Sequence, residues 1–254
     1  MNNFETLEKL MLEQGSKYDI ETVRKAYEFC VQAHKGQKRL SGEPFYMHPY
    51  SVAIILVKLG MDTETVTAAL LHDVVEDTDV ELGEIKKEFG TEIAELVDGV
   101  TKFGKMPLVT HEQQRSENVR KMMIAMAKDI RVIIIKLADR LHNMRTIDAQ
   151  PEHKQREKSL ETLEIYAPIA HRLGISAIKE ELEDISIAHL DPIAYREIEH
   201  QLNSHKEHRE QFLENIQKKI EEHVKKYVPN ITITGRVKSI HGIYRKMYVQ
   251  DKDF

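Results

Sequence analysis

The sequence has almost no cysteine, since Cys30 is the single one among 254 residues. One cysteine excludes an internal disulfide framework and fits a reducing cytosol. No apolar run approaches the roughly 20 residues that a membrane-spanning helix needs. The start of the chain also lacks the basic segment and apolar core of a secretory signal. These absences predict a cytoplasmic protein with no membrane partner.

An excess of positive charge is also missing. Lysine and arginine number 37 against 42 aspartate and glutamate residues, which gives a net charge of −5. Because a basic surface supplies most non-specific affinity for nucleic acid, we expect no nucleic-acid partner for this chain. The hydrophobic content of 41% and the charged content of 31% are ordinary for a globular protein.

Helical periodicity dominates the sequence to about residue 225, because apolar residues recur with i, i+3, i+4 spacing. This pattern predicts an all-α fold. The segment Gly36–Met47 carries two glycines and a proline and must be a loop, and a second loop is expected over 104–115. Ile133–Ile135 could suggest a strand, but the run leads into a helical pattern and we interpret it as buried helix. The expected helices cover residues 19–34, 52–59, 63–77, 82–89, 92–103, 116–127, 130–145, 153–173, 176–190 and 192–227.

The character of the sequence changes after residue 228. Ile231–Thr234 alternates β-branched residues, Gly235 breaks the pattern, and a basic helical segment follows. We expect the first strand and helix of a second, incomplete domain here.

The segment LLHDVVEDT, residues 70–78, concentrates ionisable groups at the end of an apolar helix. His72 and Asp73 present a nitrogen and an oxygen ligand at one point, and Glu76 and Asp77 follow one turn later on similar faces. Four such groups are costly to bury without a compensating cation. A solvated helix end with no special role is the alternative.

Two distant residues complete a possible ligand set. His48 follows the glycine- and proline-bearing loop, and Asp139 directly follows an apolar run. Each alone is typical of a helix cap or a satisfied core polar group. Together with His72 and Asp73 they form a nitrogen and oxygen set without thiolate, which suits Mn²⁺, Mg²⁺, Fe²⁺ or Zn²⁺ and leaves positions open for water and substrate.

Five motifs stand in a specific order: RLSGEPFYMHP, LLHDVVEDT, IKLADRLHNMRT, ETLEIYAPIAHRLG and GRVKSIHGIYRKM. From about residue 18 onward the chain resembles the RelA/SpoT homologues, long bifunctional (p)ppGpp synthetase/hydrolases whose hydrolase domain is an HD-type helical bundle. The resemblance implies an HD hydrolase domain over residues 1–195, a charged helical linker over 196–228 and the truncated start of an α/β synthetase domain over 229–254.

The resemblance also implies a reaction. A metal ion, commonly Mn²⁺, serves hydrolysis of the 3′-pyrophosphate of ppGpp or pppGpp to GDP or GTP and pyrophosphate, in stringent-response control. The residues matching Glu76 and Asp77 activate or position the attacking water. A metal ion lowers the pKa of bound water, and a nearby carboxylate accepts its proton. The implied metal ligands are His48, His72, Asp73 and Asp139.

By the same resemblance, Arg39 and Ser41 belong to a substrate loop, and Asn143 and Thr146 frame the nucleotide. A guanidinium can stack on a purine or contact phosphate, so Arg39 suits either task. A solvent-exposed charge in a basic loop is the alternative for this arginine.

Three basic residues, Arg236, Lys238 and Lys246, match the ATP-contacting segment of the synthetase domain. The acidic catalytic segment that follows in relatives is missing, so the expectation is no synthetase activity for this chain. The implied partner is the guanosine tetra- or pentaphosphate, and ribosome binding belongs to a full-length protein. Two other functions remain open: an HD phosphohydrolase acting on another nucleotide, and a non-catalytic module that senses alarmones.

Overall fold

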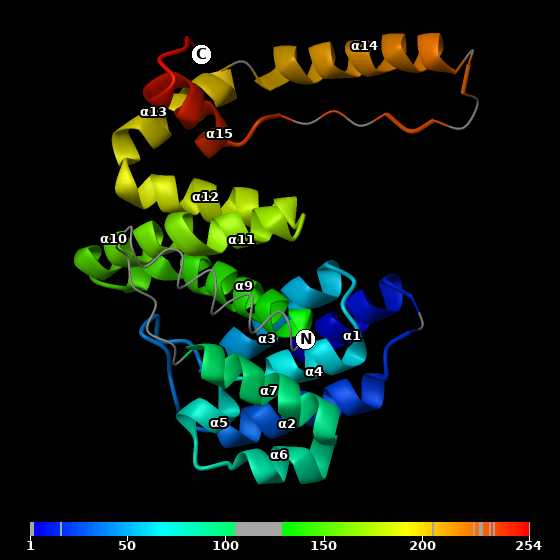
Figure 1. Cartoon of the computed structure of the whole chain (residues 1–254), viewed down its shortest axis with the longest axis vertical. Coiled ribbons are helices and arrows are strands. Elements are labelled where there is room, and N and C mark those ends of the chain that lie inside the picture. The colour runs from blue at the N-terminus through cyan, green and yellow to red at the C-terminus, as the bar shows by residue number, and fades with distance from the viewer. Residues whose placement is uncertain are drawn as a thin grey trace. The chain divides into compact units, whose positions relative to one another are not determined.

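The computed structural model describes residues 3–15, 17–104, 129–204, 206–225, 227–228, 231–233, 235 and 237–253 (Figure 1). Over these ranges the expected all-α fold is confirmed, and the only β-type pairing recorded is an isolated bridge between Lys38 and Pro44. The helix expected over 116–127, and all of the loop expected over 104–115 except its first residue, lie outside the described residues. The chain divides into two compact units, Met1–Leu182 and Glu183–Phe254.

The first unit is a bundle of helices. Its elements are α1 (Asn3–Glu13), α2 (Ile20–Ala33), α3 (Met47–Lys58), α4 (Thr63–Leu71), α5 (Val74–Asp77), α6 (Leu82–Phe89), α7 (Thr91–Gly104), α9 (Ile130–Arg145), η1 (Ile147–Ala149), α10 (Glu152–Glu161), η2 (Thr162–Tyr166), α11 (Ala167–Arg172) and the first part of α12 (Ser176–Leu190).

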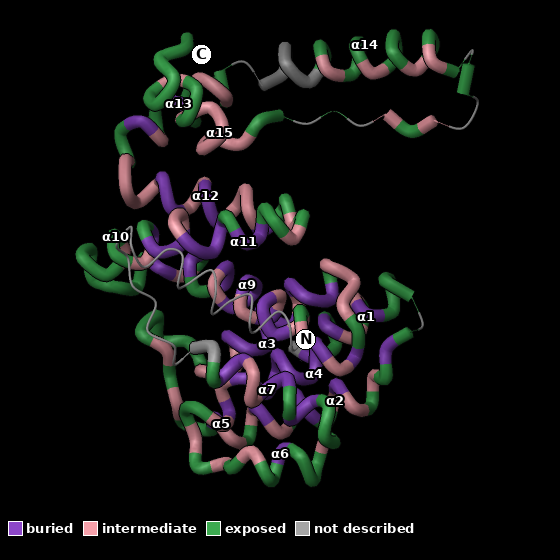
Figure 2. The backbone as a smooth tube through the Cα atoms, viewed as in Figure 1, coloured by how far each residue is buried: buried purple, intermediate pink, exposed green. Residues whose placement is uncertain are grey.

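Helix α4 lies at the centre of this bundle. All of its residues except Glu64 are buried, and it packs against α2, α3, α7 and α9 (Figure 2). A helix that is buried on nearly every side must be surrounded by other elements. Asp62 fixes where it begins, because its carboxylate accepts a hydrogen bond from Thr65 N at 2.9 Å. The end of α4 therefore lies in the interior of the bundle.

The prediction of a single helix over residues 63–77 is wrong in one respect, because the helix is broken at His72 and Asp73. The His72 side chain donates from Nδ1 to the carbonyl of Ala69 at 2.7 Å, which satisfies one of the last carbonyls of α4. A new turn then begins at Asp73, whose carbonyl accepts from the amides of Glu76 and Asp77 at 3.2 and 2.9 Å. The break turns the two ligand candidates out of the regular helix.

A second expected helix, over 153–173, is interrupted by the π-helical turn η2. The amide of Ala167 donates to the carbonyl of Thr162, five residues earlier. Pro168 follows and has no amide hydrogen, so it cannot continue the α-helical pattern of its preceding turn.

The loop expected over Gly36–Met47 is confirmed up to Tyr46, with only the isolated bridge inside it, and Met47 already begins α3. Gly36 and Gly42 have φ angles of 84° and 87°, a region that favours glycine. The Arg39 amide donates to the Glu43 carbonyl and the Arg39 carbonyl accepts from the Gly42 amide, both at 2.9 Å. This compact turn holds Arg39 in place.

The second unit contains the rest of α12, α13 (Pro192–Ser204), α14 (Lys206–Val224), α15 (Ile240–Tyr244) and η3 (Arg245–Val249). The helical segment expected after Gly235 corresponds to α15 and η3. The strand expected over Ile231–Thr234 is not formed by residues 231–233, since no described segment pairs with their backbone, and Thr234 lies outside the described residues. None of the described helices is long and apolar enough to cross a membrane.

Candidate metal centre and active site

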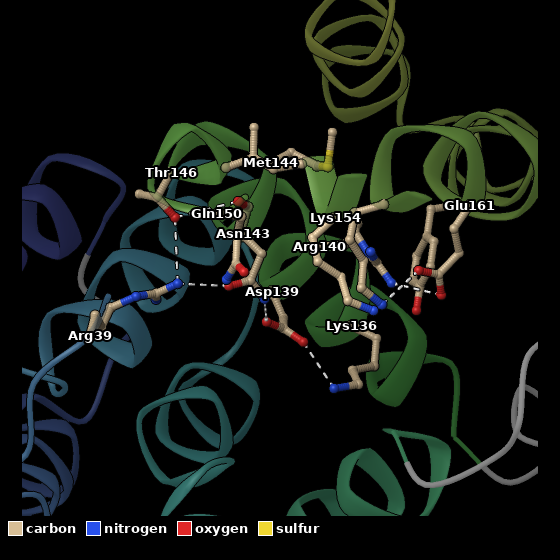
Figure 3. A pocket seen from close by; sticks show the side chains of 13 residues that line it. Arg39, Lys136, Asp139, Arg140, Asn143, Met144, Thr146, Gln150, Lys154 and Glu161 are labelled. Atoms are coloured by element: carbon tan, nitrogen blue, oxygen red, sulfur yellow. Dashed lines mark hydrogen bonds and ion pairs between the residues drawn. The ribbon is translucent and has the colours of Figure 1, made fainter. Parts of the chain in front are cut away.

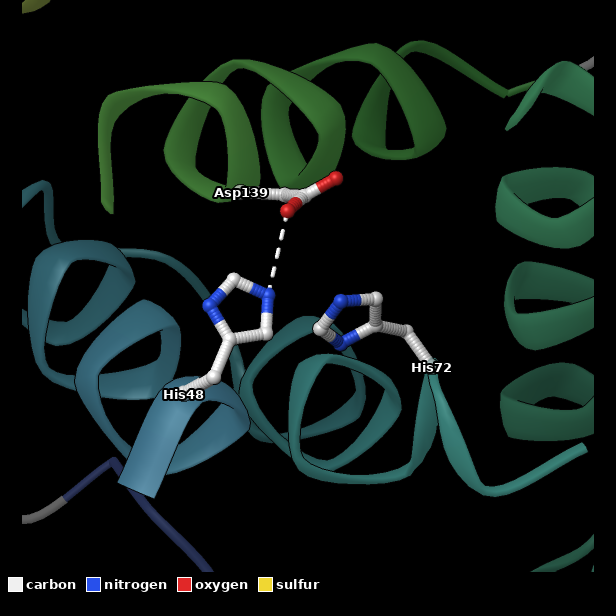
Figure 4. Close-up of side chains that lie close together, drawn as sticks. All are labelled: His48, His72 and Asp139. Atoms are coloured by element: carbon white, nitrogen blue, oxygen red, sulfur yellow. Dashed lines mark ion pairs between the residues drawn. The ribbon is translucent and has the colours of Figure 1, made fainter. Parts of the chain in front are cut away.

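Three packed segments bring the predicted ligands together. His48 is the second residue of α3, His72 and Asp73 form the turn after α4, and Asp139 lies in the middle of α9. Helices α3, α4 and α9 are in mutual contact. Figure 4 shows the two imidazole rings and the Asp139 carboxylate facing one another from these segments.

The distances are those of a shared site. His48 Nε2 lies 3.1 Å from Asp139 Oδ1 and 3.5 Å from Asp73 Oδ2, and His72 Nε2 lies 3.0 Å from Asp73 Oδ1. One ligand atom each from His48, His72 and Asp139 fall within 4.8 Å of one another. Residues 91 positions apart in the sequence thus converge on a volume that one cation could fill.

The chemistry of this group fits a divalent cation. The His72 ring donates from Nδ1 to the Ala69 carbonyl, so in the neutral ring the lone pair is on Nε2. The polar neighbour of this buried Nε2 is Asp73 Oδ1, 3.0 Å away. Without a cation this contact needs a proton on Nε2, and a metal ion between the two atoms would take the place of that proton. Two imidazoles and two carboxylates without thiolate are typical of such an ion.

The pKa shifts show that neighbouring cations keep the buried carboxyl groups of the site ionised. Burial alone would raise the pKa of Asp139, but the ammonium group of Lys136, 2.9 Å away, holds it well below its usual range. Burial likewise opposes ionisation of Asp73, yet the neighbouring His72 lowers the pKa of that carboxyl. Burial would lower the pKa of His72, but the charge of Asp73 raises it to about 9. Both carboxylates therefore stay charged and attract cations.

Glu76 and Asp77 lie on α5, beside the ligand cluster, and are exposed. Partial burial and the negative charge of Asp73 raise the pKa of both carboxyl groups, against the attraction of Lys136 for Glu76 and of His34 for Asp77. A carboxylate with a raised pKa is a stronger base at neutral pH.

Two adjoining cavities open beside the cluster. One, of about 480 Å³, is lined by His48, Asp73 and Asp139 together with Ser41 of the loop. The other, of about 420 Å³, is shown in Figure 3. Both volumes are ordinary for a small-molecule site. The residues that line both cavities are Arg39, Lys136, Asp139, Asn143, Thr146 and Gln150.

Three of the four predicted substrate residues, Arg39, Asn143 and Thr146, form a connected network at these cavities. Arg39 Nη2 donates to Asn143 Oδ1 at 2.9 Å and to Thr146 Oγ1 at 3.4 Å. Asn143 Nδ2 in turn donates to Asp139 Oδ1 at 2.6 Å. Ser41 is exposed and its hydroxyl donates to Glu43 at 3.4 Å. The loop is therefore linked to a ligand candidate through one asparagine.

The sequence reasoning missed residues that contact the site. Lys136 Nζ contacts Asp139 Oδ2 at 2.9 Å, and His142 Nδ1 contacts His48 Nδ1 at 2.8 Å. Both lie three residues from Asp139 on the same helix, so i±3 spacing around Asp139 was a signal for them. Lys154 and Lys158, which line the second cavity, follow a loop and a 3₁₀ turn that separate them from α9, so no local spacing indicated them.

The residues matching the synthetase segment form no comparable cluster among the described residues. Lys238 and Lys246 are exposed, and Arg236 lies outside the described residues. Asp184 accepts hydrogen bonds from the amides of Ile240 and His241 at the start of α15.

Residues 26–176 match the family model described as HD domain. The chain belongs to the HD domain family. Nearly all of this HD-domain chain is also similar to longer proteins. It is 42% identical over 251 residues to the bifunctional (p)ppGpp synthase/hydrolase SpoT of Escherichia coli K12. The aligned region covers 99% of this chain and 36% of that protein.

Two further relatives agree in extent and differ in their names. A guanosine-3′,5′-bis(diphosphate) 3′-pyrophosphohydrolase of Vibrio cholerae is 43% identical over 99% of this chain and 36% of its own length. A GTP pyrophosphokinase of Streptomyces coelicolor is 44% identical over 96% of this chain and 29% of its own length. The HD-domain chain thus spans about a third of the length of the curated relatives it matches. The resemblance to RelA/SpoT homologues expected from the motifs is confirmed.

Proposed function

We propose that the chain hydrolyses the 3′-pyrophosphate of ppGpp and pppGpp in a metal-dependent reaction, giving GDP or GTP and pyrophosphate. The observation that carries this proposal is the convergence of His48, His72, Asp73 and Asp139 at the edge of a cavity. The names of the Vibrio cholerae and Escherichia coli relatives support the substrate.

The proposed ligands are the two imidazoles and the two carboxylates, and the proposed ion is Mn²⁺. When bound, a divalent cation lowers the pKa of a water molecule and polarises a phosphoryl oxygen. Glu76 and Asp77 would orient that water, and Glu76 would accept its proton; the pKa values of both carboxyl groups are raised, which favours proton transfer to them. Lys136 offsets the negative charge on Asp139 Oδ2 and places a positive charge in the wall of both cavities.

The second cavity suits the other end of the substrate. Its charged lining consists of five cations, Arg39, Lys136, Arg140, Lys154 and Lys158, against two carboxylates, Asp139 and Glu161. A guanosine-3′,5′-bis(diphosphate) carries one diphosphate on the 3′ oxygen and one on the 5′ oxygen of its ribose, so one can meet the metal centre while the other meets this positive excess. The planar guanidinium of Arg39, between the two cavities, suits stacking on the purine.

The direct experiment incubates purified protein with Mn²⁺ and ppGpp and measures pyrophosphate and GDP. We expect equal amounts of both products, and no product from the His72→Ala/Asp73→Ala variant. His153→Ala, at an exposed position outside the cavities, is the matched control and should equal the wild type. An inert wild type, or a double variant as active as wild type, would refute the proposal.

Competition assays with other nucleotides and a ppGpp-binding measurement separate the alternatives. Turnover of another nucleotide in preference to ppGpp would favour a different HD phosphohydrolase, and binding without turnover would favour a sensing module. We also propose a cytoplasmic location for the protein. The proposed domains are the hydrolase domain over residues 1–195, the helical linker over 196–228 and the start of a synthetase domain over 229–254. In this last segment, Arg236, Lys238 and Lys246 are proposed to match ATP-contacting residues.

A further inference from the structure

A second histidine lies directly behind one of the proposed ligands. His48 Nδ1 and His142 Nδ1 are 2.8 Å apart, and the ring centroids are 4.9 Å apart. Both residues are buried, with 3% and 9% of their surface exposed. At this separation one nitrogen donates a hydrogen and the other accepts it.

A third contact decides which nitrogen is the donor. Arg39 Nη1 lies 3.5 Å from the same His142 Nδ1. A guanidinium has hydrogen-bond donors and no acceptor, so it can contact this nitrogen only through a lone pair. His142 Nδ1 is therefore the acceptor for both neighbours, and His48 Nδ1 is the donor.

This direction has a consequence at the other side of the His48 ring. A neutral imidazole that carries its hydrogen on Nδ1 has a bare Nε2. His48 Nε2 is the atom that faces Asp139 Oδ1 at 3.1 Å and Asp73 Oδ2 at 3.5 Å. The bare nitrogen thus points to the place where a cation would sit.

We infer that His142 is a positioning residue that fixes the tautomer and the ring orientation of His48 for metal binding. This inference rests on the metal centre proposed above, and not on the identity of the nucleotide. His72 has the same kind of support from the Ala69 carbonyl at 2.7 Å. The two imidazoles are therefore oriented in the same way, one by the backbone and one by a side chain that can be replaced.

The contact with Arg39 gives His142 a second role. Arg39 belongs to the Gly36–Met47 loop and lines both cavities. It contacts His142 and Asn143 on α9 and Thr146 directly after this helix. The loop and the His48 ligand consequently share one acceptor nitrogen. Movement of Arg39 toward a bound nucleotide would leave His142 Nδ1 to His48 alone.

The test separates the acceptor from the volume of the ring. In His142→Asn the side-chain oxygen can occupy the position of Nδ1 and accept, whereas His142→Leu fills the space without an acceptor. The dissociation constant for Mn²⁺ is measured by titration calorimetry on metal-free protein, and thermal unfolding checks the fold. We expect the leucine variant to bind Mn²⁺ about 10- to 100-fold more weakly, in line with losses of outer-shell partners. The asparagine variant should bind close to the wild type.

Equal binding by the wild type and the leucine variant would overturn the inference while leaving the metal centre intact, as would an asparagine variant as weak as the leucine one. A wild type that binds no Mn²⁺ would overturn both. If the leucine variant fails to fold, ¹⁵N spectra of the histidine rings in Zn²⁺-loaded wild type decide. A His142 ring bare at Nδ1 supports the inference, and one protonated at Nδ1 contradicts it.

Discussion

At the scale of single residues, the site is organised around Asp139. Lys136 Nζ and Asn143 Nδ2 donate to its two oxygens at 2.9 and 2.6 Å, and His48 Nε2 lies 3.1 Å from Oδ1. A buried carboxylate is tolerated only with such donors. The same partners connect it to the substrate loop through Asn143 and Arg39. Each of these contacts can be changed separately.

Replacing Lys136 by methionine should leave the buried Asp139 carboxylate without the positive charge that stabilises it. The variant keeps a long side chain but removes the ammonium, and breaking a buried pair costs about 3–5 kcal/mol. We expect the metal-free variant to unfold at lower urea concentration than wild type, and added Mn²⁺ to restore more stability to the variant than it gives wild type. Equal metal-free stability of the two proteins would contradict this charge balance.

Replacing Glu76 by glutamine should remove the proposed base and keep its shape. We expect kcat to fall by about 10²–10⁴-fold, as for lost general bases, with the Mn²⁺ affinity unchanged. Because the pKa of Glu76 is raised, activity of the wild type should fall with decreasing pH at a value above the ordinary glutamate pKa of about 4.3. A variant with wild-type kcat would assign the proton transfer elsewhere, and Asp77→Asn is the next candidate.

At the scale of elements, periodicity predicted most helices and could not predict where they break. The run Ile133–Ile135 is part of α9, as expected, with Ile133 and Ile135 buried. The breaks at His72–Asp73 and before Pro168 depend on a side chain bonding to a carbonyl and on a missing amide hydrogen, which apolar spacing does not encode. Helix α1 was not anticipated, although Phe4, Leu7 and Met11 are buried at helical spacing.

The prediction of the site had the same limit, since the sequence indicated the candidate ligands but not the residues that support them. Motif order indicated His48, His72, Asp73 and Asp139, and the structure places them together. Their hydrogen-bonded support, such as the contact of His142 with His48, depends on the crossing of α3 and α9, which no local pattern specifies.

The crossing of α7 and α9 depends on a small residue. A methyl group added at Gly99 would stand 2.7 Å from Val132 Cγ2. Overpacking of this kind costs about 1–3 kcal/mol, so Gly99→Ala should lower the free energy of unfolding by that amount in urea denaturation. Combining it with Val132→Ala should cost less than the sum of the two single changes.

Gly83 supplies the matched control for that substitution. It is exposed on α6 with nothing within 4 Å of an added Cβ. Gly83→Ala should stabilise the protein by up to about 1 kcal/mol, because alanine favours helix. A Gly99→Ala variant as stable as Gly83→Ala would show that α7 and α9 do not pack this closely.

At the scale of the whole molecule, ligand binding and folding are coupled, because the proposed ligands come from three separate helical segments. A cation that binds only the folded chain should stabilise it by about 2.7 kcal/mol at a concentration of 100 times its dissociation constant. We expect Mn²⁺ to raise the unfolding temperature of wild type and to leave that of Asp139→Asn almost unchanged. An equal rise in both proteins would place the ion elsewhere.

The most direct measurement of the central claim is the anomalous scattering of Mn²⁺ in crystals of the protein. We predict one strong peak between His48 Nε2, His72 Nε2 and the carboxylates of Asp73 and Asp139, at about 2.0–2.2 Å from each ligand atom, the range typical of divalent transition metals on such ligands. A peak away from these four side chains, or none in Mn²⁺-saturated crystals, would contradict the account.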